Sequence, residues 1–223
     1  MATRLSEQVW RFDLGAVNAY LVEDDDEVVL IDAGTPWDAD DIRSGLSDAR
    51  YDPGDLDRVL VTHYDLDHVG ALAKLDLSAT VVMGEPDASV LAGRRKPPWR
   101  NHKGAFQRLM SVFVSRPNLT VETIADGDGT GSFTAYHTPG HSPGHMAYVS
   151  TDRDVAFVGD LVREKDGRFE PPPWILSYDS DAIRESIRGY ADRVPSTAVC
   201  CPGHGDPVTM GGHRAMVQLA DQV

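Results

Sequence analysis

The segment Thr62–Gly70 reads Thr-His-Tyr-Asp-Leu-Asp-His-Val-Gly and places two histidines beside two aspartates. A short strand-like run, 57–61, precedes it, and a run with helical spacing, 69–75, follows it. We therefore expect the polar side chains in a loop at the carboxyl end of a buried strand, where open α/β sheets bind ligands. Imidazole and carboxylate groups are ligands of Zn²⁺ and of harder divalent ions. The alternative is a polar turn in which an aspartate caps the helix and the histidines are incidental.

Potential ligands also follow three later apolar or alternating runs, each beside a glycine. His141 lies in Thr-Pro-Gly-His-Ser-Pro-Gly-His, Asp160 ends Val-Ala-Phe-Val-Gly-Asp, and His204 lies in Val-Cys-Cys-Pro-Gly-His-Gly-Asp-Pro. Glycine lets the backbone turn sharply and approach an ion closely. Because four such corners occur in one chain, they favour a shared metal centre over an incidental turn.

The order of these residues resembles the five-motif signature of the metallo-β-lactamase fold superfamily. In this sequence the signature consists of Asp32, His63-x-Asp65-x-Asp67-His68, His141, Asp160 and His204, and it extends over 28–207. The resemblance implies an α/β (α+β) fold, an αβ/βα four-layer sandwich of two mixed β-sheets flanked by helices. We expect one such domain over 1–223, with a basic insertion at about 94–117.

The resemblance also implies a dinuclear site for divalent metal ions, with zinc expected and manganese or iron as alternatives. By position in the signature, the ligands of the first ion would be His63, Asp65 and His141. Those of the second ion would be Asp67, His68 and His204, and Asp160 would bridge the two ions.

Two further residues are expected behind these ligands. Asp32 would orient a ligand histidine by accepting its second N–H, although it could instead cap the helix that begins near Thr35. His145, four residues after His141, is either a similar orienting residue or a surface residue.

The activity that the resemblance implies is hydrolysis of an ester, thioester or lactone by a metal-bound hydroxide. The residues expected to carry this catalysis are His63, Asp67 and His68. An iron-dependent oxidoreductase is an alternative, since sulfur dioxygenases and flavodiiron proteins use the same scaffold. A third hypothesis is a relative that binds metal or ligand without turnover. Few residues follow His204, which disfavours the glutathione thioesters of glyoxalase II-like enzymes, because these carry a helical substrate domain there.

One position departs from the family pattern. The second motif usually reads His-x-His-x-Asp-His, and its middle histidine is Asp65 in this chain. A carboxylate adds negative charge and is a harder donor than imidazole, which favours Mn²⁺ or Fe²⁺ more than the usual ligand set does. The first site could also be weak or empty, or Asp65 could turn away from the metal.

The charge of the chain restricts its partners. The net charge of −14 argues against nucleic acid and anionic membranes, so we expect a small-molecule substrate. Lysine is nearly absent and aspartate far outnumbers glutamate, a pattern similar to proteins of salt-loving organisms. An ordinary acidic cytosolic protein is the alternative. The sequence lacks an apolar N-terminal segment and any apolar run of about 20 residues, so we expect a cytoplasmic location.

The segment Arg94–Lys103 contrasts with this acidic background. It is basic, contains two prolines and precedes a run with helical spacing, Gly104–Val114. The segment could be a lid that binds an anionic substrate, or a solvated insertion whose helix packs on the sheet. Helices are also expected over 35–49, 85–91 and 208–223, and near the Asp179 or Ser180 cap. The adjacent Cys200 and Cys201 are expected to be buried thiols on opposite faces of a strand.

Overall fold

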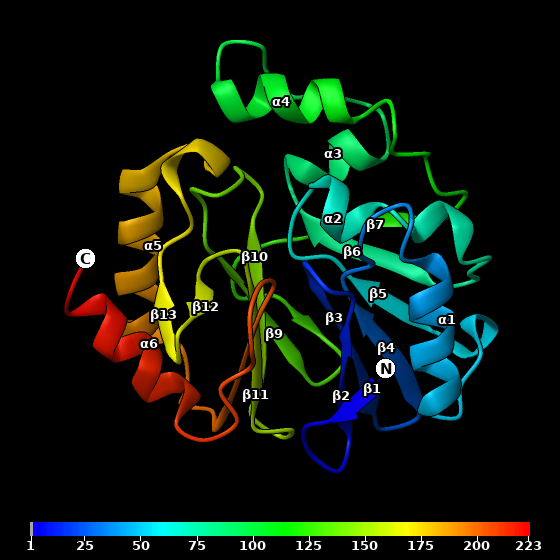
Figure 1. The fold of residues 1–223 in the computed structure, drawn as a ribbon, viewed down its shortest axis with the longest axis horizontal. Helices are drawn as coiled ribbons and strands as arrows, with labels where there is room; N and C mark the ends of the chain where they lie inside the picture. Colours follow the sequence, from blue (N-terminus) through cyan, green and yellow to red (C-terminus); the bar gives the residue numbers. More distant parts are fainter. Residues whose placement is uncertain (1) are drawn as a thin grey trace.

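The structure, a computed structural model that describes residues 2–223, has two β-sheets that pack face to face with helices on both outer sides (Figure 1). The strand order is β1-β2-β3-β4-β5-β6-β7 in one sheet and β14-β11-β10-β9-β8 in the other. Both sheets contain parallel and antiparallel pairs. The expected αβ/βα sandwich of two mixed sheets is therefore confirmed.

The N-terminal half of the chain forms the seven-stranded sheet. Its strands are β1 (Ala2–Arg4), β2 (Val9–Asp13), β3 (Asn18–Asp24), β4 (Glu27–Ile31), β5 (Arg58–Leu60), β6 (Thr80–Gly84) and β7 (Val121–Ile124). The second sheet contains β8 (Gly129–Thr130), β9 (Phe133–His137), β10 (Met146–Ser150), β11 (Val155–Gly159) and β14 (Val199–Pro202). A separate hairpin joins β12 (Arg163–Lys165) and β13 (Arg168–Glu170).

The α-helices are α1 (Ala39–Asp48), α2 (Leu66–Val69), α3 (Asp87–Leu91), α4 (His102–Met110), α5 (Ser180–Arg193) and α6 (Gly212–Ala220). Three 3₁₀ turns, η1 (Pro53–Asp55), η2 (Leu72–Lys74) and η3 (Trp174–Leu176), complete the set. None of the helices within 2–223 is long and apolar enough to cross a membrane.

Alternation along the strands explains the layers. In β3, Tyr20 and Val22 pack between the two sheets, whereas Leu21 packs against α1 on the outer side. The adjacent cysteines of β14 follow the same rule. Cys200 contacts the layer of α5 and α6, and Cys201 lies between the sheets, so both are buried on opposite faces as expected.

Several helices differ from the expected bounds. The last helix begins at Gly212 and not at Val208, because Val208 forms a β-bridge with Cys200. The expected helix 69–75 does not form: α2 already ends at Val69, and only the 3₁₀ turn η2 lies within the rest of this segment. The helix expected from Thr35 begins at Ala39, since Asp38 Oδ2 accepts a hydrogen bond from the Thr35 amide and closes a turn there.

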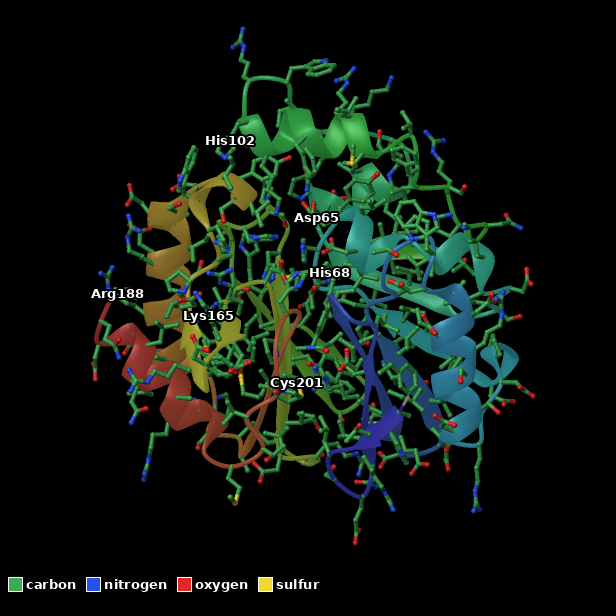
Figure 2. All side chains as sticks on the ribbon, in the orientation of Figure 1. Asp65, His68, His102, Lys165, Arg188 and Cys201 are labelled. Atoms are coloured by element: carbon green, nitrogen blue, oxygen red, sulfur yellow. The ribbon has the colours of Figure 1, made fainter. Side chains whose placement is uncertain are left out.

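Strand pairing brings the polar corners to one edge of the sandwich. Ile31 of β4 pairs in parallel with Leu60 of β5, so the loops that carry Asp32 and His63 begin side by side. In the second sheet Gly159 of β11 pairs with Pro202 of β14, which places Asp160 near His204. Figure 2 shows Asp65 and His68 between the two sheets, beneath α4.

Candidate metal centre

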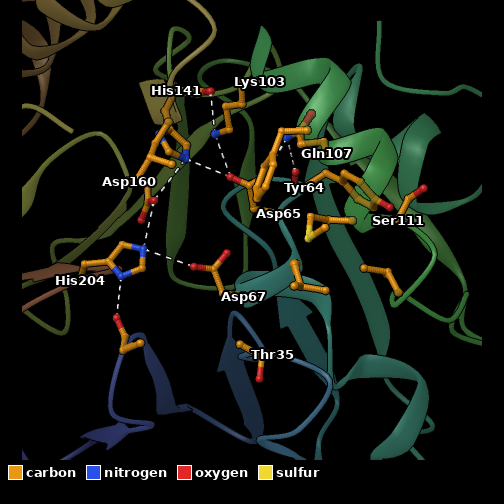
Figure 3. A pocket seen from close by; sticks show the side chains of 16 residues that line it. Thr35, Tyr64, Asp65, Asp67, Lys103, Gln107, Ser111, His141, Asp160 and His204 are labelled. Atoms are coloured by element: carbon orange, nitrogen blue, oxygen red, sulfur yellow. Dashed lines mark hydrogen bonds and ion pairs between the residues drawn. The ribbon is translucent and has the colours of Figure 1, made fainter. Parts of the chain in front are cut away.

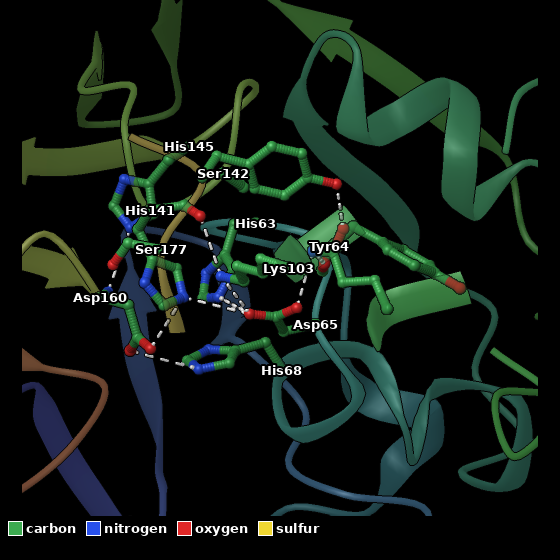
Figure 4. Close-up of polar contacts among 12 residues, drawn as sticks. His63, Tyr64, Asp65, His68, Lys103, His141, Ser142, His145, Asp160 and Ser177 are labelled. Carbon is green, nitrogen blue, oxygen red and sulfur yellow. Dashed lines mark hydrogen bonds and ion pairs between the residues drawn. The ribbon is translucent and has the colours of Figure 1, made fainter. Parts of the chain in front are cut away.

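The seven expected ligands converge where these loops meet (Figures 3 and 4). Their ligand atoms fall into three groups in which all atoms lie within 4.8 Å of one another. The groups are His63, Asp65 and His141; His63, His68 and Asp160; and Asp67, His68 and His204. The first and third groups contain the same residues as the two expected ligand sets.

Asp160 lies between the two sets, as a bridging carboxylate must. Its Oδ2 atom is 3.1 Å from His141 Nε2 and 3.2 Å from His204 Nε2. Its Oδ1 atom is 3.4 Å from His68 Nε2. One carboxylate therefore faces histidines of both sets through its two oxygens.

Asp32 holds the orientation of His68 from behind. Its carboxylate accepts hydrogen bonds from the Thr62 amide and hydroxyl, both at 2.8 Å, and lies 2.9 Å from His68 Nδ1. Because a carboxylate only accepts, the hydrogen of His68 is on Nδ1. The Nε2 atom of His68 then presents a lone pair toward Asp160, as a metal ligand does.

Two more histidines are held in the same tautomer. Thr62 Oγ1 uses its hydrogen on Asp32, so His63 Nδ1, 3.0 Å away, is the donor in that contact. His204 Nδ1 donates to the carbonyl of Ala16 over 2.7 Å. In each case Nε2 faces the centre. The Nδ1 atom of His141 has no hydrogen-bond partner in residues 2–223.

This donor set fits a metal ion. With each Nδ1 hydrogen committed, the Nε2 lone pairs of His63, His68 and His204 face carboxylate oxygens, which are also acceptors. The buried His68 Nε2 and Asp160 Oδ1 atoms lack hydrogen-bond partners among the described residues. Facing acceptors repel unless a proton or a cation lies between them, and imidazole with carboxylate suits Zn²⁺, Mn²⁺ and Fe²⁺.

The pKa values in the absence of metal follow the same geometry. The negative charge of Asp160 raises the pKa of His204 to about 9. Burial disfavours charge on His68, but the carboxylates of Asp32 and Asp160 outweigh burial and raise its pKa well above the usual value. Burial lowers the pKa of His63 and of His141. In the absence of metal, protonated His204 and His68 therefore balance the negative charge of Asp160.

His145 touches a ligand and not the centre itself. Its Nε2 atom accepts a hydrogen bond from the Asp160 amide at 3.1 Å, so its Nδ1 hydrogen is directed to Thr138 Oγ1 at 2.8 Å. Both ring nitrogens are thereby used, and burial lowers the pKa of His145 well below its usual value. The residue fixes the backbone from which the Asp160 side chain extends.

The Asp65 side chain points into the centre. Its Oδ2 atom lies 3.2 Å from His63 Nε2 and 3.1 Å from His141 Nε2. The same oxygen forms an ion pair with Lys103 Nζ at 2.7 Å (Figure 4). Although burial opposes ionisation, Lys103 and the two histidines hold the pKa of Asp65 well below its usual range.

Lys103 and Gln107 are residues of the site that the sequence did not reveal. Lys103 is only 3% exposed and also donates to the His141 carbonyl at 2.9 Å. Gln107 donates to Asp65 Oδ1 at 2.7 Å and to the Tyr64 carbonyl at 2.6 Å. Both side chains extend from α4, so this helix is attached to the metal centre. Their spacing of four residues on one helix face was the only signal available.

Asp87 connects the two loops that carry the first ligand set. Its carboxylate accepts hydrogen bonds from the amides of Tyr64 and Gly144 and from the Ser142 hydroxyl, at 2.9, 3.0 and 2.6 Å. Burial raises the pKa of Asp87 to about 6. The loops of His63 and His141 are thus held together by a residue outside both motifs.

Comparison with known proteins agrees with this geometry. The model of the metallo-beta-lactamase superfamily matches residues 12–204. The chain belongs to the metallo-β-lactamase superfamily. It is 29% identical over 218 residues to the uncharacterized protein YobT of Bacillus subtilis (strain 168), covering 89% of each chain. It is 28% identical over 193 residues to metallo-beta-lactamase domain-containing protein 1 of Xenopus laevis, covering 85% of this chain and 71% of the relative.

Among solved structures, a metallo-beta-lactamase family protein from Thermus thermophilus is similar in fold, with a TM-score of 0.76 and 21% identity. The match covers 98% of this chain and 80% of that protein. The superfamily fold therefore extends over nearly the whole chain.

Proposed function

We propose that the chain is a metal-dependent hydrolase of an ester, thioester or lactone. The observation that carries this proposal is the position of Asp160, whose two oxygens face histidines of both ligand sets. Residues His63, Asp65 and His141 would hold one divalent ion, and Asp67, His68 and His204 a second. When bound, such ions lower the pKa of water and polarise the oxygen of a carbonyl group.

The chain's own residues prepare the site for this chemistry. Thr62, Asp32 and the Ala16 carbonyl hold three histidines with Nε2 directed inward, so that these three rings need not rotate when metal binds. His145 fixes the backbone of Asp160, and Lys103 with Gln107 fixes both oxygens of Asp65. This degree of preorganisation is what a catalytic metal site requires.

The pocket residues favour water as the nucleophile. Two aliphatic hydroxyls line the cavity wall. Ser111 donates its hydrogen to the Arg108 carbonyl, and Thr35 Oγ1 accepts a hydrogen bond from the Trp37 amide, so neither is bonded to a histidine or carboxylate base. Both cysteines are buried away from the site, and burial raises the pKa of the Cys201 thiol well above its usual value. Activated water is therefore the best-supported nucleophile, and this supports hydrolysis over covalent catalysis.

Zinc is the proposed metal, since the site combines imidazole and carboxylate donors. The extra carboxylate of Asp65 also suits iron, which keeps an iron-dependent oxidoreductase as a second candidate. Protein purified without added metal distinguishes the two. Zinc or manganese with ester turnover supports the hydrolase, and iron with oxygen consumption supports the oxidoreductase.

The proposal also concerns location and partners. We propose a cytoplasmic location and a small-molecule substrate. The net charge of −14 supports the substrate class, because it opposes binding to nucleic acid and to anionic membranes. The metal-centre cavity supports a small-molecule substrate, because its volume of about 330 Å³ is at the small end of ligand pockets.

The test compares metal-loaded protein with chelated protein on a panel of esters, thioesters and lactones. We expect turnover only with metal, and its loss in Asp160→Asn, because a carboxamide cannot bridge two ions with two anionic oxygens. Asp192→Asn on the exposed surface of α5 is the matched control and should keep both metal content and turnover. Full metal loading without turnover of any panel member would contradict the proposal.

A further inference from the structure

One face of α4 is divided between polar and apolar residues. Lys103, Phe106, Gln107 and Met110 follow the spacing that places side chains on one side of a helix. Lys103 and Gln107 are bonded to Asp65, as described above. Phe106 and Met110 line a cavity of about 330 Å³ that opens onto the metal centre (Figure 3). Helix α4 therefore holds Asp65 through Lys103 and Gln107 and lines the cavity beside the metal centre.

The remainder of the cavity wall is also largely apolar. Side chains from other elements that line it include Leu66, Val114 and Leu176. The cavity reaches the expected ligands Asp65, Asp67, His141, Asp160 and His204 at its inner end. A substrate placed there would have its reacting group at the metal centre and its remaining atoms against hydrocarbon.

The charges of the cavity disfavour an anionic substrate tail. Among the described residues that line it, Lys103 is the one lysine or arginine, and its ammonium already donates to Asp65 and to the His141 carbonyl. Arg95 and Lys96 of the basic segment line a neighbouring cavity, which shares Tyr64, Ser111 and Val114 with this one, and they do not line the metal-centre cavity itself. Away from the metal centre, an anionic tail would lose its hydration without a free lysine or arginine in the cavity wall to pair with it.

The mouth of the cavity is rimmed by exposed hydrophobic side chains. Phe106 is 54% exposed and Leu176 is 48% exposed. Trp37 and Phe113, whose rings lie 6.2 Å apart, are close in sequence to the lining residues Thr35 and Val114. Exposed apolar side chains that gather around a cavity are typical of a ligand-binding site.

We propose that this cavity binds the hydrocarbon chain of a neutral acyl substrate, whose ester, thioester or lactone bond lies at the metal centre. The inference rests on the proposed hydrolase function and specifies its substrate class. In the reaction one water adds to the acyl carbon and the C–O or C–S bond breaks. The leaving oxygen or sulfur takes a proton, so the products are a carboxylic acid and an alcohol or thiol, which remain one molecule for a lactone.

The first experiment measures kcat/KM of the zinc-loaded protein with para-nitrophenyl acetate, butanoate, hexanoate and octanoate. We expect kcat/KM to rise about two- to fourfold per added methylene until the acyl chain of the substrate fills the cavity. The mono-para-nitrophenyl ester of adipic acid has the hexanoate chain with a terminal carboxylate. Its kcat/KM should be lower than that of the hexanoate by about tenfold or more, because the carboxylate must be desolvated.

Two matched substitutions on α4 test where the hydrocarbon chain of the substrate lies. Phe106→Ser should flatten the dependence on chain length, because Phe106 lines the cavity. Leu109→Ser is the control, since Leu109 is also largely exposed, at 61%, but does not line the cavity. It should leave the whole series unchanged. Both residues are on the surface of α4, so neither substitution removes a buried core contact.

A binding series separates this inference from the proposed function. Calorimetry with acetamide, butanamide, hexanamide and octanamide measures binding to the zinc-loaded protein without turnover, and affinity should rise with chain length. Hydrolysis with no preference for chain length, or with a preference for the adipate ester, would overturn the apolar site while leaving the hydrolase intact. Absence of all hydrolysis, with amide affinities that still rise, would overturn the hydrolase and support the apolar site.

Discussion

Lys103 Nζ lies 2.7 Å from Asp65 Oδ2, at the position where the superfamily usually has a histidine ligand. The carboxylate and the ammonium together carry no net charge, as a neutral imidazole does. As a ligand, Asp65 paired with Lys103 would supply a hard oxygen donor without adding net charge to the centre. Because Lys103 belongs to α4, the counter-charge of Asp65 is supplied by the helix that lines the cavity.

The first prediction concerns this pair as a unit. Asp65→His alone leaves the ammonium of Lys103 buried without its partner and close to a cation site. We expect this variant to bind less zinc than the wild type, and the double variant Asp65→His/Lys103→Met to recover binding with a preference for Zn²⁺ over Mn²⁺. Metal content after dialysis against equal concentrations of both ions measures the effect. Equal metal content and ratio in all three proteins would show that Asp65 is not a ligand.

The second prediction concerns the charge of Lys103 in the metal-free protein. Lys103→Met removes one partner of a buried pair, which should lower the free energy of unfolding by about 3–5 kcal/mol. A bound cation can neutralise Asp65 instead, so zinc should stabilise this variant more than it stabilises the wild type. Urea unfolding with chelator and with zinc gives both values. Lys165→Met, on the exposed surface of β12, is the control for loss of charge. Identical zinc stabilisation of wild type and Lys103→Met would refute the coupling.

The third prediction concerns pH. Because Asp160 raises the pKa of His204 to about 9, protonated His204 favours the folded metal-free protein. This contribution is fully present below the unfolded pKa of about 6.5 and is lost as the pH rises through 9. The free energy of unfolding of metal-free wild type should therefore fall between about pH 6.5 and 9 by more than that of His204→Gln. Parallel pH profiles for the two proteins would contradict the assigned ion pair.

The fourth prediction concerns salt. The excess of aspartate and the net charge of −14 produce repulsion across the surface that salt screens. The Tm of the metal-loaded protein should rise steadily from low to molar KCl. A Tm that is constant or falls over this range would argue against adaptation to high salt.

The convergence of the candidate ligands could be predicted from the sequence because their loops follow strands, and strands that pair in parallel end at a common edge of the sheet. His63, Asp160 and His204 are examples, since pairing of β4 with β5 and of β11 with β14 brings their loops together. Local spacing in the chain carries this information. The positions of the candidate metal-binding loops therefore follow from short motifs and from the topology that the motifs imply.

The supporting residues could not be predicted because they act across long separations in the chain. Lys103 is 38 residues from both Asp65 and His141, and no local pattern distinguishes it from the other basic residues of 94–103. The sequence predicts a lid or a solvated insertion over 94–103, and neither alternative indicates that Lys103 at the end of this segment is buried and paired with Asp65. The start of α6 was misplaced for a similar reason, since the bridge of Val208 to Cys200 is a tertiary contact.

The central claim is that Asp160 joins two metal sites formed by His63, Asp65 and His141 and by Asp67, His68 and His204. The most direct measurement is a crystal structure of zinc-soaked protein with anomalous scattering recorded at the zinc edge. We predict two peaks, each about 2.0–2.2 Å from the ligand atoms of one set, with one Asp160 oxygen bound to each ion. A single peak, or peaks outside these residues at full occupancy of added zinc, would contradict the two-ion account.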